Sequence, residues 1–268
     1  MNMKALKIAT LAGCLLFAVI DISACADAGA GVGNPAKGFD PVKGSDSVKG
    51  FAVVELFTSE GCSSCPPADQ LMARIQQEVK DQPVYILAFH VDYWNRLGWK
   101  DIFSDAAYSQ RQNQYAAWLN LQSVYTPQVV VNGSKEFVGS EESTVRKAIS
   151  DGLQELSPTQ LTLADVRQDK GKIAWRYQAR NAGHNTSLLV AMVQRSATSQ
   201  VKAGENSGRT LSHVQIVRQL KTAKVDANGS GAGYLPLPAG VSTADVEIIA
   251  FLQDNDNGRI IAATRSSL

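Results

Sequence analysis

The chain has 268 residues, of which 44% are hydrophobic and 19% are charged. A chain of this length and composition can bury a substantial core and is long enough for two domains. Its formal net charge is +1, and it has neither a basic tract nor an acidic tail. This balance excludes the electrostatic footprint of a nucleic-acid-binding protein, so we expect no nucleic-acid partner.

The N-terminus has the pattern of a secretory signal peptide. Lys4 and Lys7 precede an apolar run, Ile8–Ile20, and small residues follow as far as Ala28. A basic start, a short apolar run and a small-residue exit are typical of exported proteins. The run is shorter than the roughly 20 residues that a transmembrane helix needs. We predict a signal peptide over residues 1–25 and a location in the periplasm or cell envelope; a buried N-terminal helix is the alternative.

Two modes of signal removal compete. Residues Ile22 to Cys25 resemble a bacterial lipobox, in which Cys25 is lipidated and becomes the first residue. The small residues around Cys25 also fit ordinary cleavage, which adds no lipid. Residues 26–50 are rich in Gly, Ala, Asp, Ser and Lys and predict a flexible linker. A linker of this kind suits a lipid-anchored protein, so lipidation at Cys25 is the favoured prediction.

The pattern of residues 51–156 predicts an α/β thioredoxin-like domain. Apolar, β-branched runs predict buried strands, and the apolar spacing after the cysteines predicts an amphipathic helix. Asn132-Gly133 is a two-residue hairpin signal. A final helix is indicated by Val145, Ile149 and Leu153. The other predicted elements are the strands Phe51–Thr58, Val84–Val91, Gln128–Val131 and Lys135–Val138, and the helices Pro66–Lys80 and Ser104–Leu119, the latter with Ser104 as N-cap.

The remaining residues, 157–268, predict an all-β sandwich-like domain. Short strands separated by Gly- and Asn-rich turns are typical of such a domain, and Asn257-Gly258 predicts the final hairpin. The expected strands are Gln160–Val166, Ile173–Ala179, Ser187–Val193, Thr210–Leu220, Val246–Gln253 and Arg259–Thr264.

The cysteine pair Cys62-Ser-Ser-Cys65 is the strongest candidate for chemistry. A Cys-x-x-Cys motif between a buried strand and a helix places the first cysteine at the helix N-terminus, where free N–H groups and the helix dipole stabilise a thiolate. The second cysteine then resolves the mixed disulfide. Zinc is disfavoured because it needs about four ligands. A structural disulfide and a Cu(I) site remain open as alternatives.

Several motifs resemble a family of secreted bacterial thioredoxin-like proteins of unknown function. The resemblance covers most of the chain from Val53 to its end. It implies a thioredoxin-like domain followed by a β-rich domain, and no settled activity. Asn95 and Ile102 depart from the Asp and Pro usual in the family, which affects only loop detail. The resemblance rests on Val53–Asp69, Phe89–Trp94, Gly98–Asp101, Val124–Gln128, Val131–Gly133, Gly204–His213 and Val217–Arg218.

The thioredoxin resemblance also implies roles for residues beyond the cysteines. Glu55 would move protons to and from the resolving cysteine, although a solvated carboxylate is the alternative. Pro127 would follow a cis peptide bond opposite the cysteine pair, against the alternative of an ordinary trans loop proline. Thr126 would hold a substrate chain by backbone pairing. His90 and Trp94 would line a binding groove or belong to the core.

The leading functional hypothesis is therefore an envelope thiol–disulfide oxidoreductase in which Cys62 attacks and Cys65 resolves, with Cys62 the more accessible thiol. Its partners would be envelope proteins with thiols or disulfides, and it would need no metal or other cofactor. The alternatives are a binding or scaffold protein with an inert disulfide and a Cu(I) metallochaperone.

Overall fold

Strands dominate residues 50–268, the part of the chain that a computed structural model describes. The predicted signal peptide, the lipidation site Cys25 and the linker before Gly50 lie outside the described residues. Among those described, 43% are in strands and 21% in helices. Five elements are helical: α1 (Pro66–Glu78), η1 (Asn95–Leu97), α2 (Ala106–Trp118), α3 (Glu142–Gln154) and η2 (Thr243–Asp245).

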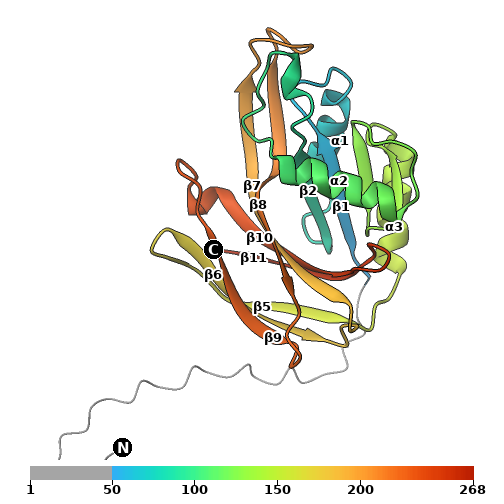
Figure 1. The fold of residues 1–268 in the computed structure, drawn as a ribbon, viewed down its shortest axis with the longest axis vertical. Coiled ribbons are helices and arrows are strands. Elements are labelled where there is room, and N and C mark those ends of the chain that lie inside the picture. Colours follow the sequence, from blue (N-terminus) through green and yellow to red (C-terminus); the bar gives the residue numbers. More distant parts are fainter. Residues whose placement is uncertain (1–49) are drawn as a thin grey trace, which may run out of the picture. The chain divides into compact units, whose positions relative to one another are not determined.

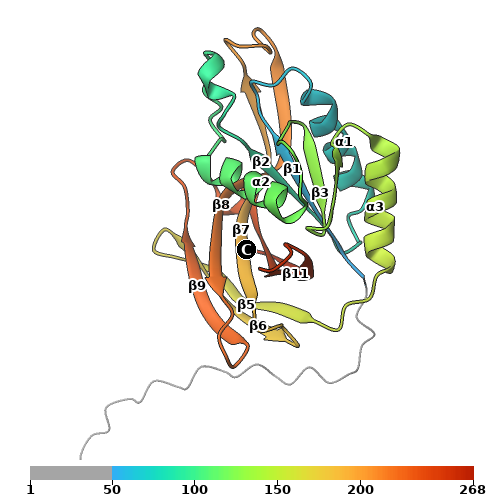
Figure 2. The same ribbon diagram turned by 45° about the vertical axis from the view of Figure 1, so that its right-hand side comes forward.

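Eleven strands of the described part form two sheets. The larger sheet has eight strands in the order β11-β10-β7-β8-β2-β1-β3-β4, and the smaller has the order β5-β6-β9 (Figure 1 and Figure 2). The strands are β1 (Ala52–Thr58), β2 (Val84–His90), β3 (Gln128–Val131), β4 (Lys135–Val138), β5 (Gln160–Asp169), β6 (Lys172–Arg180), β7 (Thr186–Gln200), β8 (Thr210–Lys224), β9 (Ser230–Pro236), β10 (Val246–Asp254) and β11 (Ile260–Ser267).

Strand β1 lies within the large sheet and is buried on both faces. It pairs with β2 in parallel and with β3 antiparallel. Because side chains alternate across a strand, Val54 and Leu56 pack toward α1 and α3, whereas Val53 and Phe57 pack toward α2. Figure 2 shows α2 on one side of these strands and α1 with α3 on the other. The double burial explains why every residue of the strand except Glu55 and Thr58 is apolar.

The small sheet packs against the part of the large sheet that contains β7, β10 and β11. Trp175 and Tyr177 of β6 join a core cluster with apolar residues of β7, β10 and β11. Strand β9, which the sequence analysis did not predict, pairs Gly233 with Trp175 and Gly231 with Tyr177. A Cβ atom at either glycine would lie 2.7 Å from the paired ring. Glycine is required there because the aromatic rings cover the backbone.

The predicted fold class, a thioredoxin-like α/β domain followed by an all-β sandwich-like domain, is wrong. Strands on both sides of residue 156 belong to one mixed eight-stranded sheet, because β8 lies along the edge of β2 and pairs with it in parallel at Ala88 and Ile216. The described residues fall within one compact unit. The sequence of a strand shows that the strand is buried, but not which strand it pairs with, and the prediction placed Thr210–Leu220 in a separate domain.

Individual elements were closer to expectation than their assembly. The two Asn-Gly turns occur between β3 and β4 and between β10 and β11. Helix α2 begins later than predicted, because Asp105 is its N-cap and accepts a hydrogen bond from the N–H of Ala107. The expected strands Ser187–Val193 and Thr210–Leu220 extend into the 15-residue strands β7 and β8. The extra length carries the loop between them to the cysteine pair.

Candidate functional site

The cysteine pair lies where β1 ends and α1 begins. Cys62 and Cys65 form a disulfide with a Cα–Cα distance of 5.5 Å. Cys65 is the N-cap of α1, and its carbonyl oxygen accepts hydrogen bonds from the N–H groups of Ala68 (2.9 Å) and Asp69 (3.2 Å). Pro66 and Pro67 occupy the first helical turn and bring no N–H groups. The helix end therefore offers Cys62 its dipole, but fewer free N–H donors than the sequence analysis assumed.

Both sulfur atoms are shielded from solvent in the oxidised pair. Cys62 and Cys65 are each 0% exposed, whereas Ser63 and Ser64 between them are exposed. The oxidised pair contains no free thiol, so the greater accessibility expected of Cys62 stays a prediction for the reduced protein. A partner approaching the pair meets the two serines first, and exchange at sulfur requires a local opening of residues 59–65, here called the cysteine loop.

A cis peptide bond joins Thr126 and Pro127, which confirms the predicted isomer. The carbonyl oxygen of Thr126 accepts a hydrogen bond from Ser64 Oγ at 3.4 Å, and its side-chain Oγ1 accepts one from Trp94 Nε1 at 2.9 Å. Trp94 also lies against the cysteine loop, because a Cβ added to Gly61 would be 3.0 Å from Trp94 Cβ. Of the residues predicted to bind a substrate, Thr126 and Trp94 thus lie beside the cysteine pair.

The loop between β7 and β8, residues 201–209, closes over the cysteine loop from the other end of the sequence. The buried Asn206 donates from Nδ2 to the carbonyl oxygens of Glu60 and Cys62, each at 2.9 Å. The N–H of Ser63 donates to Glu205 Oε2 at 2.9 Å. Sequence reasoning missed both residues, although they fall within the motif Gly204–His213 that carried part of the resemblance.

The cysteine loop contributes Glu60 to a buried group of five ionisable residues, here called the acid–histidine cluster: Glu60, Asp69, His90, Asp101 and His213. His90 Nδ1 and Asp101 Oδ2 are 2.7 Å apart, and the same oxygen accepts the N–H of Glu60 at 2.9 Å. Burial raises the pKa of Asp101, but His90 and hydrogen-bond donors outweigh burial and lower it. The prediction that His90 lines a substrate groove is wrong, because its side chain is wholly buried in this cluster.

His213 of β8 faces two carboxylates of the cluster. Its Nε2 lies 3.6 Å from Glu60 Oε1, and its Nδ1 lies 4.0 Å from Asp69 Oδ1. These distances are those of ion pairs and are too long for hydrogen bonds. Burial lowers the pKa of His213, but Asp69 and Glu60 raise the pKa by more than burial lowers it. The resulting pKa is about 9. His213 is therefore a buried cation at neutral pH, held between residues that precede and follow the cysteine pair.

The cluster connects the cysteine loop to four other parts of the chain: α1, β2, the segment between η1 and α2, and β8. Asp69 belongs to α1 and accepts a hydrogen bond from Thr58 Oγ1 at 3.2 Å. Trp99 Nε1 donates to Glu60 Oε2 at 2.7 Å, and the rings of His90 and His213 meet edge to face at 4.8 Å. Such a cluster can hold or release protons next to a reacting pair. Among residues 50–268, no group of three or more His, Cys, Asp or Glu is arranged to hold a metal ion.

Glu55 has different partners from those expected of a proton carrier. It is fully buried, and Arg111 binds its two carboxylate oxygens at 2.5 and 2.8 Å. Tyr115 donates a third hydrogen bond from its hydroxyl, also at 2.5 Å. The expected alternative of a solvated carboxylate is wrong, and these contacts link β1 to α2 without involving the cysteine loop.

The chain belongs to the family described as "Protein of unknown function (DUF1223)", whose model matches residues 53–253. Membership of a family of unknown function is thus confirmed, whereas the comparisons do not confirm its description as secreted and thioredoxin-like. Among the residues that the structure describes, no helix is long and apolar enough to cross a membrane.

The chain matches several solved structures, and two of them differ widely in their similarity to it. A crystal structure of a structural-genomics protein from Agrobacterium tumefaciens is 27% identical, with a TM-score of 0.61, and the match covers 83% of this chain and 95% of that one. A β-glucosidase from Kluyveromyces marxianus is 12% identical, with a TM-score of 0.22 over 42% of this chain and 14% of that one, which is too weak to support any argument. A search of curated proteins finds no match.

Proposed function

We propose that the protein is a thiol–disulfide oxidoreductase that acts on cysteines of other proteins through Cys62 and Cys65. The observation that carries this proposal is the disulfide at the junction of a buried strand and a helix, with two exposed serines between its cysteines. A three-residue spacing closes too small a loop to constrain the unfolded chain strongly, so stabilisation alone is a weak reason for the bond.

The proposed reaction conserves atoms and electrons. In the reducing direction, the Cys62 thiolate attacks a substrate disulfide, forms a mixed disulfide and releases the first substrate thiolate. The Cys65 thiolate then attacks Cys62 Sγ, which forms the intramolecular disulfide and releases the second substrate thiolate. Two electrons pass to the substrate, and the protons of Cys62 and Cys65 neutralise its two thiolates. The oxidising direction is the reverse, and each turnover requires an external thiol or disulfide to reset the pair.

Two neighbouring features support a protein substrate. The exposed Ser63 and Ser64 present the cysteine loop to solvent, and the segment before Pro127 adjoins it through the bond between Ser64 and the Thr126 carbonyl. An extended chain placed between Trp94 and the serines would meet backbone groups of both segments. The acid–histidine cluster supplies groups that can take up the protons exchanged when the pair changes its redox state.

The location proposed for this activity is the cell envelope. The basic start and apolar run before residue 25 support export, and Cys25 offers a site for a lipid anchor. Protein disulfides also form and persist in oxidising compartments such as the cell envelope.

Trapping of the mixed disulfide tests the proposal. A Cys65→Ser variant cannot release an attacked partner, so cells that express it should accumulate adducts that disappear on reduction. A Cys62→Ser, Cys65→Ser double variant is the matched control and should form none. If Cys65→Ser forms no adduct at an expression level at which the wild-type protein is abundant, the enzymatic proposal fails.

A scaffold protein with an inert disulfide is the second candidate, and one observation favours it. Both cysteines are fully buried, and Asn206 fixes the Cys62 carbonyl oxygen. This candidate predicts that both cysteine variants retain full biological activity and form no adducts. A Cu(I) carrier would instead lose copper binding in both single Cys→Ser variants and would trap no protein.

A further inference from the structure

A second candidate binding site lies away from the cysteine loop, at the point where β2 and β8 separate. The two strands pair at one position, Ala88 with Ile216, and the preceding residue Gln215 has a positive φ of 52°. Toward the start of β2 the sheet opens into a cavity of about 490 Å³. This volume falls within the range of small-molecule sites in proteins, roughly 300–1,000 Å³.

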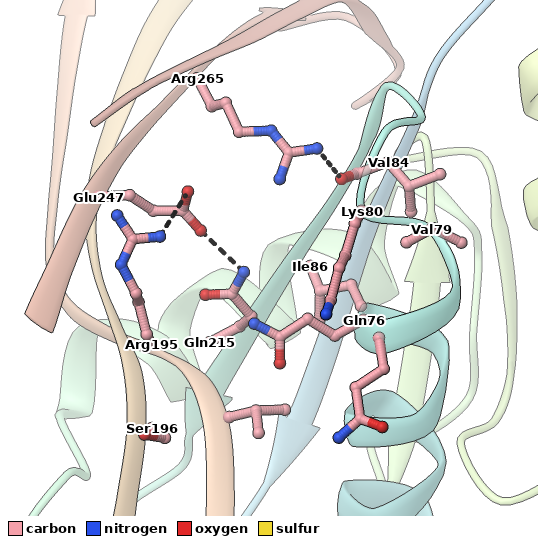
Figure 3. Close-up of a pocket in the computed structure, with 12 residues that line it drawn as sticks. Gln76, Val79, Lys80, Val84, Ile86, Arg195, Ser196, Gln215, Glu247 and Arg265 are labelled. Atoms are coloured by element: carbon pink, nitrogen blue, oxygen red, sulfur yellow. Dashed lines mark hydrogen bonds and ion pairs between the residues drawn. The ribbon is translucent and has the colours of Figure 1, made fainter.

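Three cationic side chains line this cavity and come from different elements. Figure 3 shows Lys80, just after α1, Arg195 of β7 and Arg265 of β11 reaching into it. Arg265 is fixed in place, because its Nη2 donates to the carbonyl oxygens of Gln82 (2.9 Å) and Val84 (3.0 Å). Lys80 has no ion pair or hydrogen-bond partner among the described residues.

One buried carboxylate offsets part of this charge. Glu247 is 2% exposed, lies 3.5 Å from Arg195 Nη1, and accepts a hydrogen bond of 2.8 Å from Gln215 Nε2. With three cations against one carboxylate, the cavity keeps an excess of two positive charges. Such an excess on converging side chains favours a ligand that carries negative charge.

The amide oxygen of Gln215 favours a ligand that also carries a hydrogen-bond donor. Gln215 is 4% exposed and lines the cavity, and its Oε1 is buried with no hydrogen-bond partner among the described residues. A buried acceptor without a partner is unfavourable, so a ligand that donates a hydrogen bond there would gain affinity. Val84 and Ile86 supply apolar wall beside these polar groups.

We infer that this cavity binds a small organic oxyanion, a carboxylate or a phosphate ester, that carries a hydroxyl or amine near its charged group. Lys80 and Arg265 contact the oxyanion, since guanidinium and ammonium groups pair well with carboxylate and phosphate. The hydroxyl or amine donates to Gln215 Oε1. This site is independent of the thiol chemistry proposed above.

Calorimetric titration of the full chain at low ionic strength tests the inference, with glycerol 3-phosphate and malate as probes and glycerol as the neutral control. At least one anionic probe should bind saturably, and glycerol should not. Binding by glycerol 3-phosphate alone would identify a phosphate ester, and binding by malate alone a carboxylate. If neither anion saturates, or if glycerol binds as tightly, the inference is overturned.

Two variants should shift the affinity in opposite directions. Lys80→Gln removes an exposed cation and should weaken binding by about fivefold, whereas Lys224→Gln, a matched exposed lysine outside the cavity, should leave it unchanged. Glu247→Gln removes the carboxylate and should tighten binding. Equal affinities for wild type and Lys80→Gln would overturn the inference, as would weaker binding by a correctly folded Glu247→Gln protein.

Discussion

At the scale of single residues, His213 ties the stability of the protein to pH. Glu60 and Asp69 raise the pKa of its side chain to about 9, above the ordinary value of 6.5. A pKa raised by folding contributes stability that is complete below pH 6.5 and is lost as the pH rises through 9. The contribution is on the order of 3 kcal/mol.

We therefore predict that His213→Gln lowers the free energy of unfolding strongly at pH 6 and much less at pH 10. Urea denaturation across this pH range measures the difference, with the exposed His184→Gln as the matched control. A difference between wild type and His213→Gln that stays constant from pH 6 to pH 10 would show that His213 is not a buried cation.

Loss of the buried ion pair between Glu55 and Arg111 should lower the free energy of unfolding by a similar amount. Arg111→Gln leaves the Glu55 carboxylate buried without its cation, which should cost about 3–5 kcal/mol of unfolding free energy. Arg74→Gln is the matched control, because Arg74 and Glu142 are 51% and 45% exposed and such pairs contribute about 1 kcal/mol or less. Thermal or urea unfolding tests this, and equal losses in the two variants would contradict the assignment.

At the scale of elements, the β7–β8 loop contacts the cysteine loop, and we predict that it limits access to the cysteine pair. Asn206 holds the cysteine loop by two hydrogen bonds, each contributing about 1 kcal/mol to its closed form. Asn206→Ala should therefore increase the rate of disulfide reduction by dithiothreitol about thirtyfold.

The control for this loop is Ser207→Ala. Ser207 is exposed, and its hydroxyl bonds to the Lys202 carbonyl within the same loop, away from the cysteines. The disulfide of the Ser207→Ala variant should be reduced at the same rate as that of the wild-type protein. If Asn206→Ala and Ser207→Ala are reduced at the same rate, the β7–β8 loop does not limit access to the pair.

At the scale of the whole molecule, the core joins the two segments that the sequence analysis separated. Val53 and Phe89 share a core cluster with Ala191 and Phe251, and Arg111 contacts both Glu55 of β1 and Gln253 of β10. We predict that residues 51–156 and 157–268 unfold in one cooperative transition. Hydrogen exchange at increasing urea should give the same midpoint for peptides from β1 and β6. Two separated midpoints would restore the division into two domains.

The sequence predicted local features well and their assembly poorly. Apolar runs and Asn-Gly turns indicated most strands because both depend on neighbouring residues. Three contacts that decide the assembly join residues 56 to 144 positions apart, so no local pattern encodes them. They are the pairing of β2 with β8, the hydrogen bond from Asn206 to Cys62, and the ion pair of Glu55 with Arg111. Strand β9 was missed because its glycines, which make room for Trp175 and Tyr177, read as a turn.

The most direct test of the central claim is whether Cys62 and Cys65 exchange electrons in the native protein. The folded protein is equilibrated in glutathione buffers of graded potential, quenched by alkylation and analysed by mass spectrometry. We predict a reversible two-electron transition within the range of the buffer, with the same midpoint approached from the oxidised and reduced sides. A pair that stays oxidised in every buffer, and is reduced by dithiothreitol only after denaturation, would contradict the account.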